Sequence, residues 1–250
     1  MAKRFLADNK RILLTITSFV IALSIFSGVS IYAERSQTTL KSKYEIIDLG
    51  GNTPGIWPAW HLADEQTLNI RIVALDKISP HKISVIKDAI LSEKSADFKN
   101  SIMNTASNSD SVFYNGWKGA LGEASKQHTF LYIPSKIRVI DTDANSDVTI
   151  TLTNKQNEDG YSGYTKSIEG SNMIQGASIT IYDVSNLSNE QLATITRHEM
   201  GHALGLAHSS APDDLMHAII MTPSFISPCD IYEIVHIYNI ERSNHFGCDT

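Results

Sequence analysis

Hydrophobic and polar residues follow two different spacings in successive parts of the chain. Between Leu68 and Leu75 apolar side chains alternate with less apolar ones, which is typical of a strand with one buried face. Ser79 and Pro80 come next and suit the N-cap and the first position of a helix. Isoleucines three or four positions apart then mark one helix face at Ile83, Ile86 and Ile90. The pattern therefore predicts a strand followed by a helix.

The middle of the chain predicts further strands after a polar interruption. Residues 92–111 are rich in serine and asparagine and have lost the helical pattern, so we expect an insertion or loop there. A second helical segment is expected from Val112 to about Ala124. Strand candidates separated by polar or glycine-containing turns follow at Thr129–Ile133, Ile137–Ile140, Val148–Leu152 and Ala177–Tyr182.

Two helices in the last third of the chain have well-marked starts. Ser188 and Gln191 form a capping-box pair, which predicts a helix over residues 189–204. Ser227 and Pro228 predict the start of a final helix. Strands and helices are therefore mixed along the chain.

The first 35 residues differ from the rest. Lysines and arginines precede an uncharged run of 22 residues, Ile12–Ala33, which as a helix would reach about 33 Å and cross the apolar part of a bilayer. We expect residues 1–35 to be a membrane anchor or a cleaved signal peptide, with a buried helix as a third interpretation. Because the basic flank stays in the cytoplasm, the rest is expected to be extracytoplasmic, either membrane-anchored or, after cleavage, secreted.

Composition and charge narrow the picture of the remaining chain. Residues 36–45 are polar and are expected to be a tether, followed by a domain over residues 46–250 that begins close to Tyr44. Hydrophobic residues make up 42% and charged residues 19% of the 250 residues, which is enough apolar material for a packed core. The net charge is −6 and basic residues cluster only at the N-terminus, so a nucleic-acid partner is not expected.

Two further residue groups suggest weaker hypotheses. Cys229 and Cys248 are too few for a cysteine-based zinc site but could form one disulfide in an oxidising compartment. Acidic and amide residues over 141–147 have the spacing that opens a calcium loop. Since the glycine and glutamate of an EF-hand loop are missing, we expect a solvated hairpin turn there, and Ca2+ is not favoured.

The candidate chemistry lies at the end of the helix predicted over residues 189–204. His198 and His202 would stand about 40° apart around the helix axis, so both imidazoles can reach one ion. Glu199 lies on the adjacent flank, where it can act on a metal-held water without being a ligand. Gly205 suits the left-handed turn that ends a helix, and the chain can then return to bring in His208. Three imidazoles leave one zinc position open, as in catalytic sites.

The run from His198 to Ser210, together with Asp214-Leu215-Met216, resembles the metzincin zinc peptidases and is most similar to the matrixins. The resemblance implies that Met216 is the Met-turn methionine that packs beneath the metal ligands, with Met221 as the alternative. It implies an α+β fold with a twisted mixed sheet and two long helices, in which the zinc helix closes an upper subdomain. A small lower subdomain would hold the Met-turn and the C-terminal helix.

Some matrixin features are missing from the sequence. It has no Pro-Arg-Cys-Gly segment of the family's latency peptide, so a cysteine switch is not expected. Residues 176–183 carry no histidine, so the second, structural zinc of matrixins is not expected either. Residues 217–220 stand where matrixins have Tyr-Pro, which leaves the specificity pocket undefined.

The expected function is that of a zinc metalloendopeptidase with one catalytic Zn2+ and Glu199 as the general base. Its expected partners are protein or peptide substrates and, through the N-terminal segment, a membrane. Two alternatives are a non-catalytic zinc-binding surface protein and a zinc amidase that acts on a cell-envelope polymer. Glu199 argues against the first, because metal binding alone does not require that residue.

Overall fold

The computed structural model describes residues 39–48, 58–97, 112–141, 146–171, 173–211, 214–222 and 224–239. These residues belong to one compact unit that begins at Thr39. None of the helices within these ranges is both long enough and apolar enough to span a bilayer. The expected anchor or signal over residues 1–35 lies outside them, and so does Cys248. Cys229 is disulfide-bonded, and its pairing with Cys248 stays a prediction.

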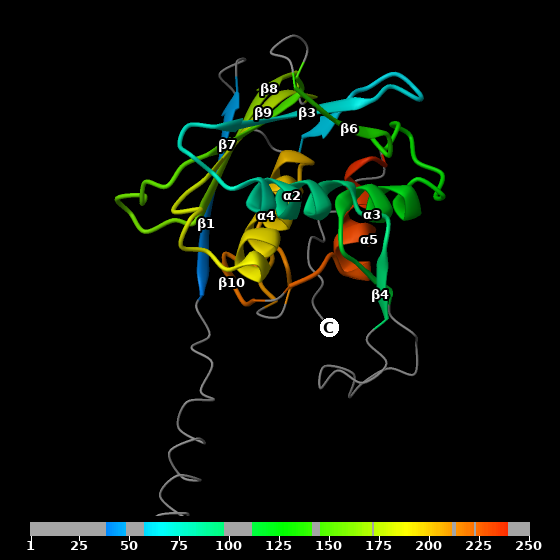
Figure 1. Ribbon diagram of the computed structural model, residues 1–250. Helices are drawn as coiled ribbons and strands as arrows, with labels where there is room; N and C mark the ends of the chain where they lie inside the picture. The colour runs from blue at the N-terminus through cyan, green and yellow to red at the C-terminus, as the bar shows by residue number, and fades with distance from the viewer. Residues whose placement is uncertain are drawn as a thin grey trace, which may run out of the picture. The chain divides into compact units, whose positions relative to one another are not determined.

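An eight-stranded mixed sheet forms the frame of the domain (Figure 1). The strand order is β10-β1-β8-β9-β7-β3-β6, with β2 also paired to β9. The strands β3, β6, β7 and β9 run parallel to one another, whereas β8 is antiparallel to β9. The bounds are β1 Leu40–Asp48, β2 Ala59–Trp60, β3 Leu68–Ala74, β6 Ile137–Ile140, β7 Val148–Leu152, β8 Gly163–Gly170, β9 Met173–Ile181 and β10 Ile219–Ile220.

The described helices lie on one side of this sheet in Figure 1. They are α2 (Pro80–Leu91), α3 (Trp117–Ala124), α4 (Asn189–Ala203) and α5 (Pro228–Ile237). The central helix α4 packs against α2 and against β1, β8 and β9, while α3 packs against α5. Since α4 carries two of the three candidate metal ligands, His198 and His202, its position between the sheet and the other helices places those two side chains inside the domain.

Two tryptophans fix α4 through its backbone. The Trp117 indole N–H donates to the carbonyl of Arg197 at 2.7 Å, and the Trp60 indole N–H donates to the carbonyl of Ala203 at 2.8 Å. Both indoles are buried. Buried Trp side chains usually bond their N–H group, and here that requirement ties α3 and β2 to the ligand helix.

Several predicted elements are confirmed by the structure. The strand at residues 68–74 and the strands at residues 137–140 and 148–152 match their predictions, and β9 extends the strand predicted at residues 177–182. Both helix caps are also present, because the Ser79 hydroxyl accepts from a backbone N–H and Ser188 and Gln191 form the complete capping box.

Other predictions in the middle of the chain are wrong. Residues 112–114 form a strand, β5, which pairs with β4 (Ser95–Asp97) inside the predicted insertion. The helix predicted over residues 112–124 therefore starts only at Trp117, although it ends at Ala124 as predicted. Residues 129–133 are not a strand, because Leu131 donates its N–H to the carbonyl of Tyr238 at 2.9 Å instead of to a neighbouring strand.

The predicted hairpin over residues 141–147 is also wrong, although residues 142–145 lie outside the described ranges. β6 and β7 both run parallel to β3 and flank it on opposite sides, so the chain crosses β3 between them. Asp147 closes this crossover by accepting the backbone N–H of Asn69 at 2.7 Å.

The sheet begins earlier than predicted. β1 starts at Leu40, so residues 40–45, which we expected to belong to a polar tether, are part of the sheet. An alternation is present in the sequence, since Leu40, Tyr44 and Ile46 alternate with the exposed Lys41, Lys43 and Glu45. The buried Ser42 interrupts its apolar side, and the three charged residues suggested a polar tether instead.

Candidate metal centre

Three histidines converge at the end of α4 and the loop that follows it. His198 and His202 lie on the same face of α4, and His208 returns from the loop. One ligand nitrogen from each lies within 4.8 Å of the others. The Nε2 atoms of His202 and His208 are 3.1 Å apart. Two imidazole nitrogens bound to one zinc at about 2.0–2.1 Å would have a similar separation.

Backbone carbonyls fix the orientation of the two buried rings. His198 Nδ1 lies 2.6 Å from the carbonyl oxygen of Leu215, and His202 Nδ1 lies 2.8 Å from that of Leu206. Each Nδ1 must carry the hydrogen to donate, which leaves the Nε2 lone pair free for a metal. Within the described part of the chain, the buried Nε2 of His198 has no hydrogen-bond partner. A metal ion would satisfy this atom.

The surroundings keep these rings in the form that binds metals. Burial lowers the pKa of His198 to about 3 and that of His202 well below its usual value. Burial also lowers the pKa of His208, although that side chain is partly exposed. The three imidazoles are therefore neutral at neutral pH, as metal ligands must be.

Gly205 makes the return of the chain feasible. Its φ is +106°, a left-handed conformation that residues with a side chain rarely adopt, and an added Cβ would lie 2.4 Å from the carbonyl oxygen of Pro58. The N–H of Leu206 then bonds back to the carbonyl of Gly201 at 3.0 Å. As predicted, the helix ends here and the chain turns toward His208.

Met216 lies against the ligand helix. It is buried, and a Cβ added to Gly201 would lie 2.5 Å from its sulfur. The backbone N–H of Met216 donates to the Asp214 carboxylate at 2.8 Å, and the backbone carbonyl of Met216 accepts the N–H of Ser209 at 2.9 Å. The alternative, Met221, is 38% exposed. Of the two candidates, Met216 is the one that packs against the ligand helix, and its assignment as the Met-turn methionine stays a prediction.

Glu199 is held by β8, a strand that sequence reasoning missed. Its side chain is fully buried, and the Thr165 hydroxyl donates to its Oε2 at 2.6 Å. Gly163 leaves room for this carboxyl, since a Cβ there would lie 2.3 Å from Oε1. Burial raises the pKa of Glu199 to about 8, and the hydroxyls of Ser42 and Thr165 act in the opposite direction.

The family model described as Matrixin matches residues 91–239, more than half of the chain. The chain belongs to the matrixin family. No curated protein matches it. The family and the predicted α+β fold with a twisted mixed sheet are thereby confirmed, and the matrixin domain supports a metalloendopeptidase that uses zinc.

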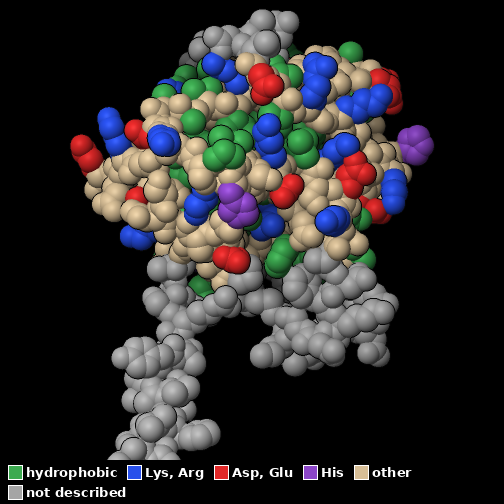
Figure 2. Space-filling view, viewed as in Figure 1, with side chains coloured by type: hydrophobic (Ala, Val, Ile, Leu, Met, Phe, Trp, Pro, Cys, Tyr) green, Lys and Arg blue, Asp and Glu red, His purple; other side chains and the backbone are tan. Residues whose placement is uncertain are grey.

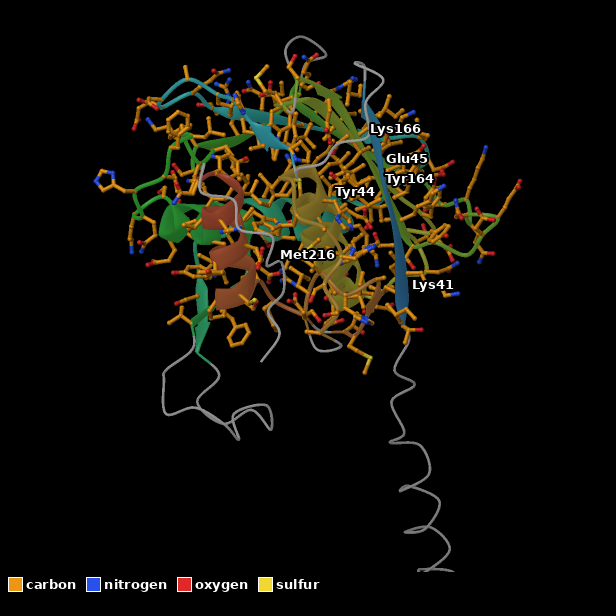
Figure 3. The ribbon with its side chains drawn as sticks, turned by 180° about the vertical axis from the view of Figure 1, so that it is seen from behind. Lys41, Tyr44, Glu45, Tyr164, Lys166 and Met216 are labelled. Carbon is orange, nitrogen blue, oxygen red and sulfur yellow. The ribbon has the colours of Figure 1, made fainter. Side chains whose placement is uncertain are left out.

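This matrixin has an aromatic ring stacked on one of its candidate ligands. Tyr44 of β1 lies over His202 with ring centroids 4.5 Å apart and planes inclined by 7°. Figure 3 shows Tyr44 between β1 and α4. Burial raises the pKa of Tyr44 to about 12, so its hydroxyl is protonated at neutral pH. No sequence motif pointed to Tyr44, because it precedes the matched region and lies 158 positions before His202.

The donor set of this matrixin fits zinc. Three neutral nitrogens of intermediate softness converge from one side, and a carboxylate lies beside them on the next helix position. The buried, unpartnered His198 Nε2 within the described ranges supports the same assignment.

Proposed function

We propose that this chain is a zinc-dependent endopeptidase in which His198, His202 and His208 hold one Zn2+ and Glu199 is the general base. The observation that carries the proposal is the convergence of three neutral imidazole nitrogens beside a buried carboxylate. The ligands occupy three of the four positions that zinc usually offers, which leaves one for water or substrate.

The protein's own residues would supply the proton transfers. Zinc, when bound, acts as a Lewis acid that activates water and polarises the scissile carbonyl. Burial alone would keep Glu199 protonated at neutral pH, but the positive charge of a zinc ion held beside it would favour the ionised carboxylate. In that form Glu199 would take a proton from the attacking water, whose oxygen bonds to the carbonyl carbon. The same carboxyl then delivers that proton to the amide nitrogen as the C–N bond breaks, which releases an amine and a carboxylate. Thr165 orients Glu199 through its hydroxyl hydrogen bond.

We further propose that the catalytic domain acts outside the cytoplasm, either anchored by residues 1–35 or released by their cleavage. The basic and then apolar order of that segment supports this placement. Protease accessibility of the domain on intact cells would test it. Digestion only after cell lysis would contradict the placement.

Replacing Glu199 with Gln tests the proposed chemistry. Gln is almost isosteric with Glu but cannot accept the proton, so zinc content should stay near one ion per chain while peptide hydrolysis falls by about 100-fold or more. Zinc is measured by mass spectrometry of the metal and turnover with casein and a peptide library. Unchanged turnover in E199Q would remove Glu199 from this role.

The same assays separate the alternatives. A non-catalytic zinc-binding protein would hold zinc and hydrolyse neither peptides nor other amides. An envelope amidase would hydrolyse cell-wall or glycan amides in preference to peptides. Peptide cleavage that requires both zinc and Glu199 supports the endopeptidase.

A further inference from the structure

A groove of about 590 Å³ lies between α2 and α4 and reaches the segment that follows α2. The two helices pack against each other and lie on the same side of the sheet (Figure 1). The groove also touches Asn115, which precedes α3. Its volume falls in the range of sites that bind small molecules, about 300–1,000 Å³.

This groove is distinct from the candidate metal centre. Ala193 and Arg197 line it and are four positions apart, so they share one face of α4. A helix turns by about 100° per residue, which directs Arg197 about 100° away from His198 and about 160° away from Glu199. A ligand in the groove would therefore meet a different face of α4 from the one that holds the metal ligands, independently of the proposed function.

Arg197 brings a positive charge into the wall of the groove and is only 7% exposed. Its Nε donates to the carbonyl of Asn115 at 2.7 Å, and its Nη1 donates to the carbonyl of Ser224 at 2.9 Å. The guanidinium lies over the Phe225 ring, 4.9 Å from its centroid. All of these partners are neutral, and within the described ranges no carboxylate lies within 4.0 Å of the guanidinium. Since buried charges are usually paired, a bound anion would supply the missing partner.

The guanidinium also has hydrogen-bond donors that remain available. It carries five N–H groups, of which two bond the carbonyls of Asn115 and Ser224. Within the described part of the chain, Nη2 makes no hydrogen bond. Because a planar guanidinium matches the geometry of a carboxylate, Arg197 can bind a carboxylate and keep both of its bonds to the backbone.

The other residues of the groove limit the charge of the anion. Val85 and Leu91 contribute apolar surface. Of the exposed charged residues that line the groove, Asp88 and Glu93 are negative and Lys94 is positive, so their sum is −1. This excess of negative charge repels a dianion such as phosphate more strongly than a monoanion. The groove therefore suits a single carboxylate attached to an apolar body.

We propose that this groove is a binding site for a small organic monocarboxylate, in which Arg197 binds the carboxylate and the apolar walls cover the rest of the ligand. The ligand would bind a cation that already connects α4 to the residues before α3 and α5. Only the folded protein offers this site, so the ligand should also stabilise the domain against unfolding.

Isothermal titration calorimetry of the full chain, supplied with zinc, tests the site. The probe is phenylacetate, compared with its uncharged analogue phenylacetamide and with inorganic phosphate. Saturating acetohydroxamate occupies the metal ion and keeps carboxylates away from it. Phenylacetate should bind with a Kd no weaker than about 1 mM, and phenylacetamide and phosphate should each bind at least about 10-fold more weakly. N-acetyl-leucyl-leucine shows whether a free acid or a peptide C-terminus is the better source of the carboxylate.

Two pairs of variants locate the binding. Arg197→Met removes the charge, and Arg138→Met, at an exposed position of β6, is its control. Ala193→Leu fills part of the groove, and Ser84→Leu, at an exposed position of α2 outside the groove, is its control. R197M and A193L should each weaken phenylacetate binding at least about 10-fold, and both controls should stay within about twofold of wild type. Thermal unfolding and zinc content verify folding, and A193L decides if R197M does not fold.

The absence of phenylacetate binding in acetohydroxamate would overturn the proposal, because Arg197 would then only brace the backbone. Binding of phenylacetamide or phosphate as tight as that of phenylacetate would overturn it as well, and so would wild-type affinity in A193L or in folded R197M. These results do not depend on peptide hydrolysis. A chain that binds phenylacetate in the groove and hydrolyses no peptide would contradict the endopeptidase proposal alone.

Discussion

Gly201 shows how one missing side chain shapes the metal centre. It lies on α4 just before His202, and a Cβ there would come within 2.5 Å of the Met216 sulfur and 3.2 Å of the Trp117 ring. Glycine inside a helix costs about 0.5–1 kcal/mol relative to alanine. The close packing of Met216 and Trp117 against α4 offsets that cost at this position.

A Gly→Ala substitution inside a helix usually stabilises a protein, but at Gly201 we expect it to destabilise. We expect the free energy of unfolding to fall by about 1–3 kcal/mol, because Met216 or α4 must shift, and zinc affinity should weaken with it. Gly122→Ala in α3 is the control, since nothing lies within 4 Å of its added Cβ, and it should stabilise by about 0.5–1 kcal/mol. Urea unfolding measures both. Equal effects of G201A and G122A would contradict the packing argument.

At the scale of elements, the bounds of α4 could be predicted from residues at its own two ends, whereas the strands that pack beside it could not. Ser188 and Gln191 fix the start of α4 by their own hydrogen bonds, and Gly205 ends it. The metal ligands and Glu199 lie on or just after this helix, so sequence spacing sufficed to find them. Local signals of this kind do not depend on the rest of the fold.

Sequence analysis missed the strands β1 and β8, whose inward side chains face the candidate metal centre. Their inward positions include Ser42 and Tyr44 on β1 and Thr165 and Ser167 on β8. On β8 these buried polar side chains remove the alternation by which strands are recognised, whereas on β1 only Ser42 interrupts it. The residues that hold Glu199 and cover His202 were hidden for the same reason, since their roles arise only when distant segments meet.

The start of α5 contains a buried carboxyl group that should make stability depend on pH. Asp230 is 2% exposed, and its Oδ2 accepts the N–H of Ser227 at 2.7 Å. Burial, and next the nearby charge of Asp214, raise the pKa of Asp230 well above its usual value. The folded protein therefore keeps this proton to a higher pH than the unfolded chain does.

The sign of the resulting effect follows from proton linkage. Above about pH 4, where the unfolded Asp230 ionises, the free energy of unfolding should fall as pH rises toward the folded pKa, by about 1.4 kcal/mol per pH unit while one proton separates the states. Asp230→Asn keeps the capping oxygen and should flatten this slope in urea titrations at several pH values. A slope unchanged in D230N would contradict the assignment.

Asp76→Asn is a control, because the pKa of Asp76 is lowered in the folded protein whereas that of Asp230 is raised. The backbone N–H of Asn154 and then the hydroxyl of Thr153 lower the pKa of Asp76. Its contribution is therefore present above the unfolded pKa and is lost as pH falls through the folded value. D76N should alter only the acid side of the stability profile.

At the scale of the whole molecule, the site is assembled from segments spread across the chain. β1 supplies Tyr44, β8 supplies Thr165, and the loop after α4 supplies His208 and Met216. The matrixin match begins at residue 91, yet the sheet needs β1, β2 and β3 from before it. On the face seen in Figure 2, basic and acidic side chains are interspersed around the described domain. The candidate site draws most of its groups from the interior of the fold, since His198, Glu199 and His202 are fully buried.

The coordination of zinc in the purified full chain tests the central claim most directly. X-ray absorption at the zinc edge should show about one zinc per chain with three imidazole nitrogens at about 2.0–2.1 Å and one further light atom from water. His208→Ala should remove one imidazole, whereas His128→Ala, at an exposed position, should change nothing. A fourth protein ligand, a sulfur ligand, or the absence of stoichiometric zinc would contradict a catalytic centre built on these three histidines.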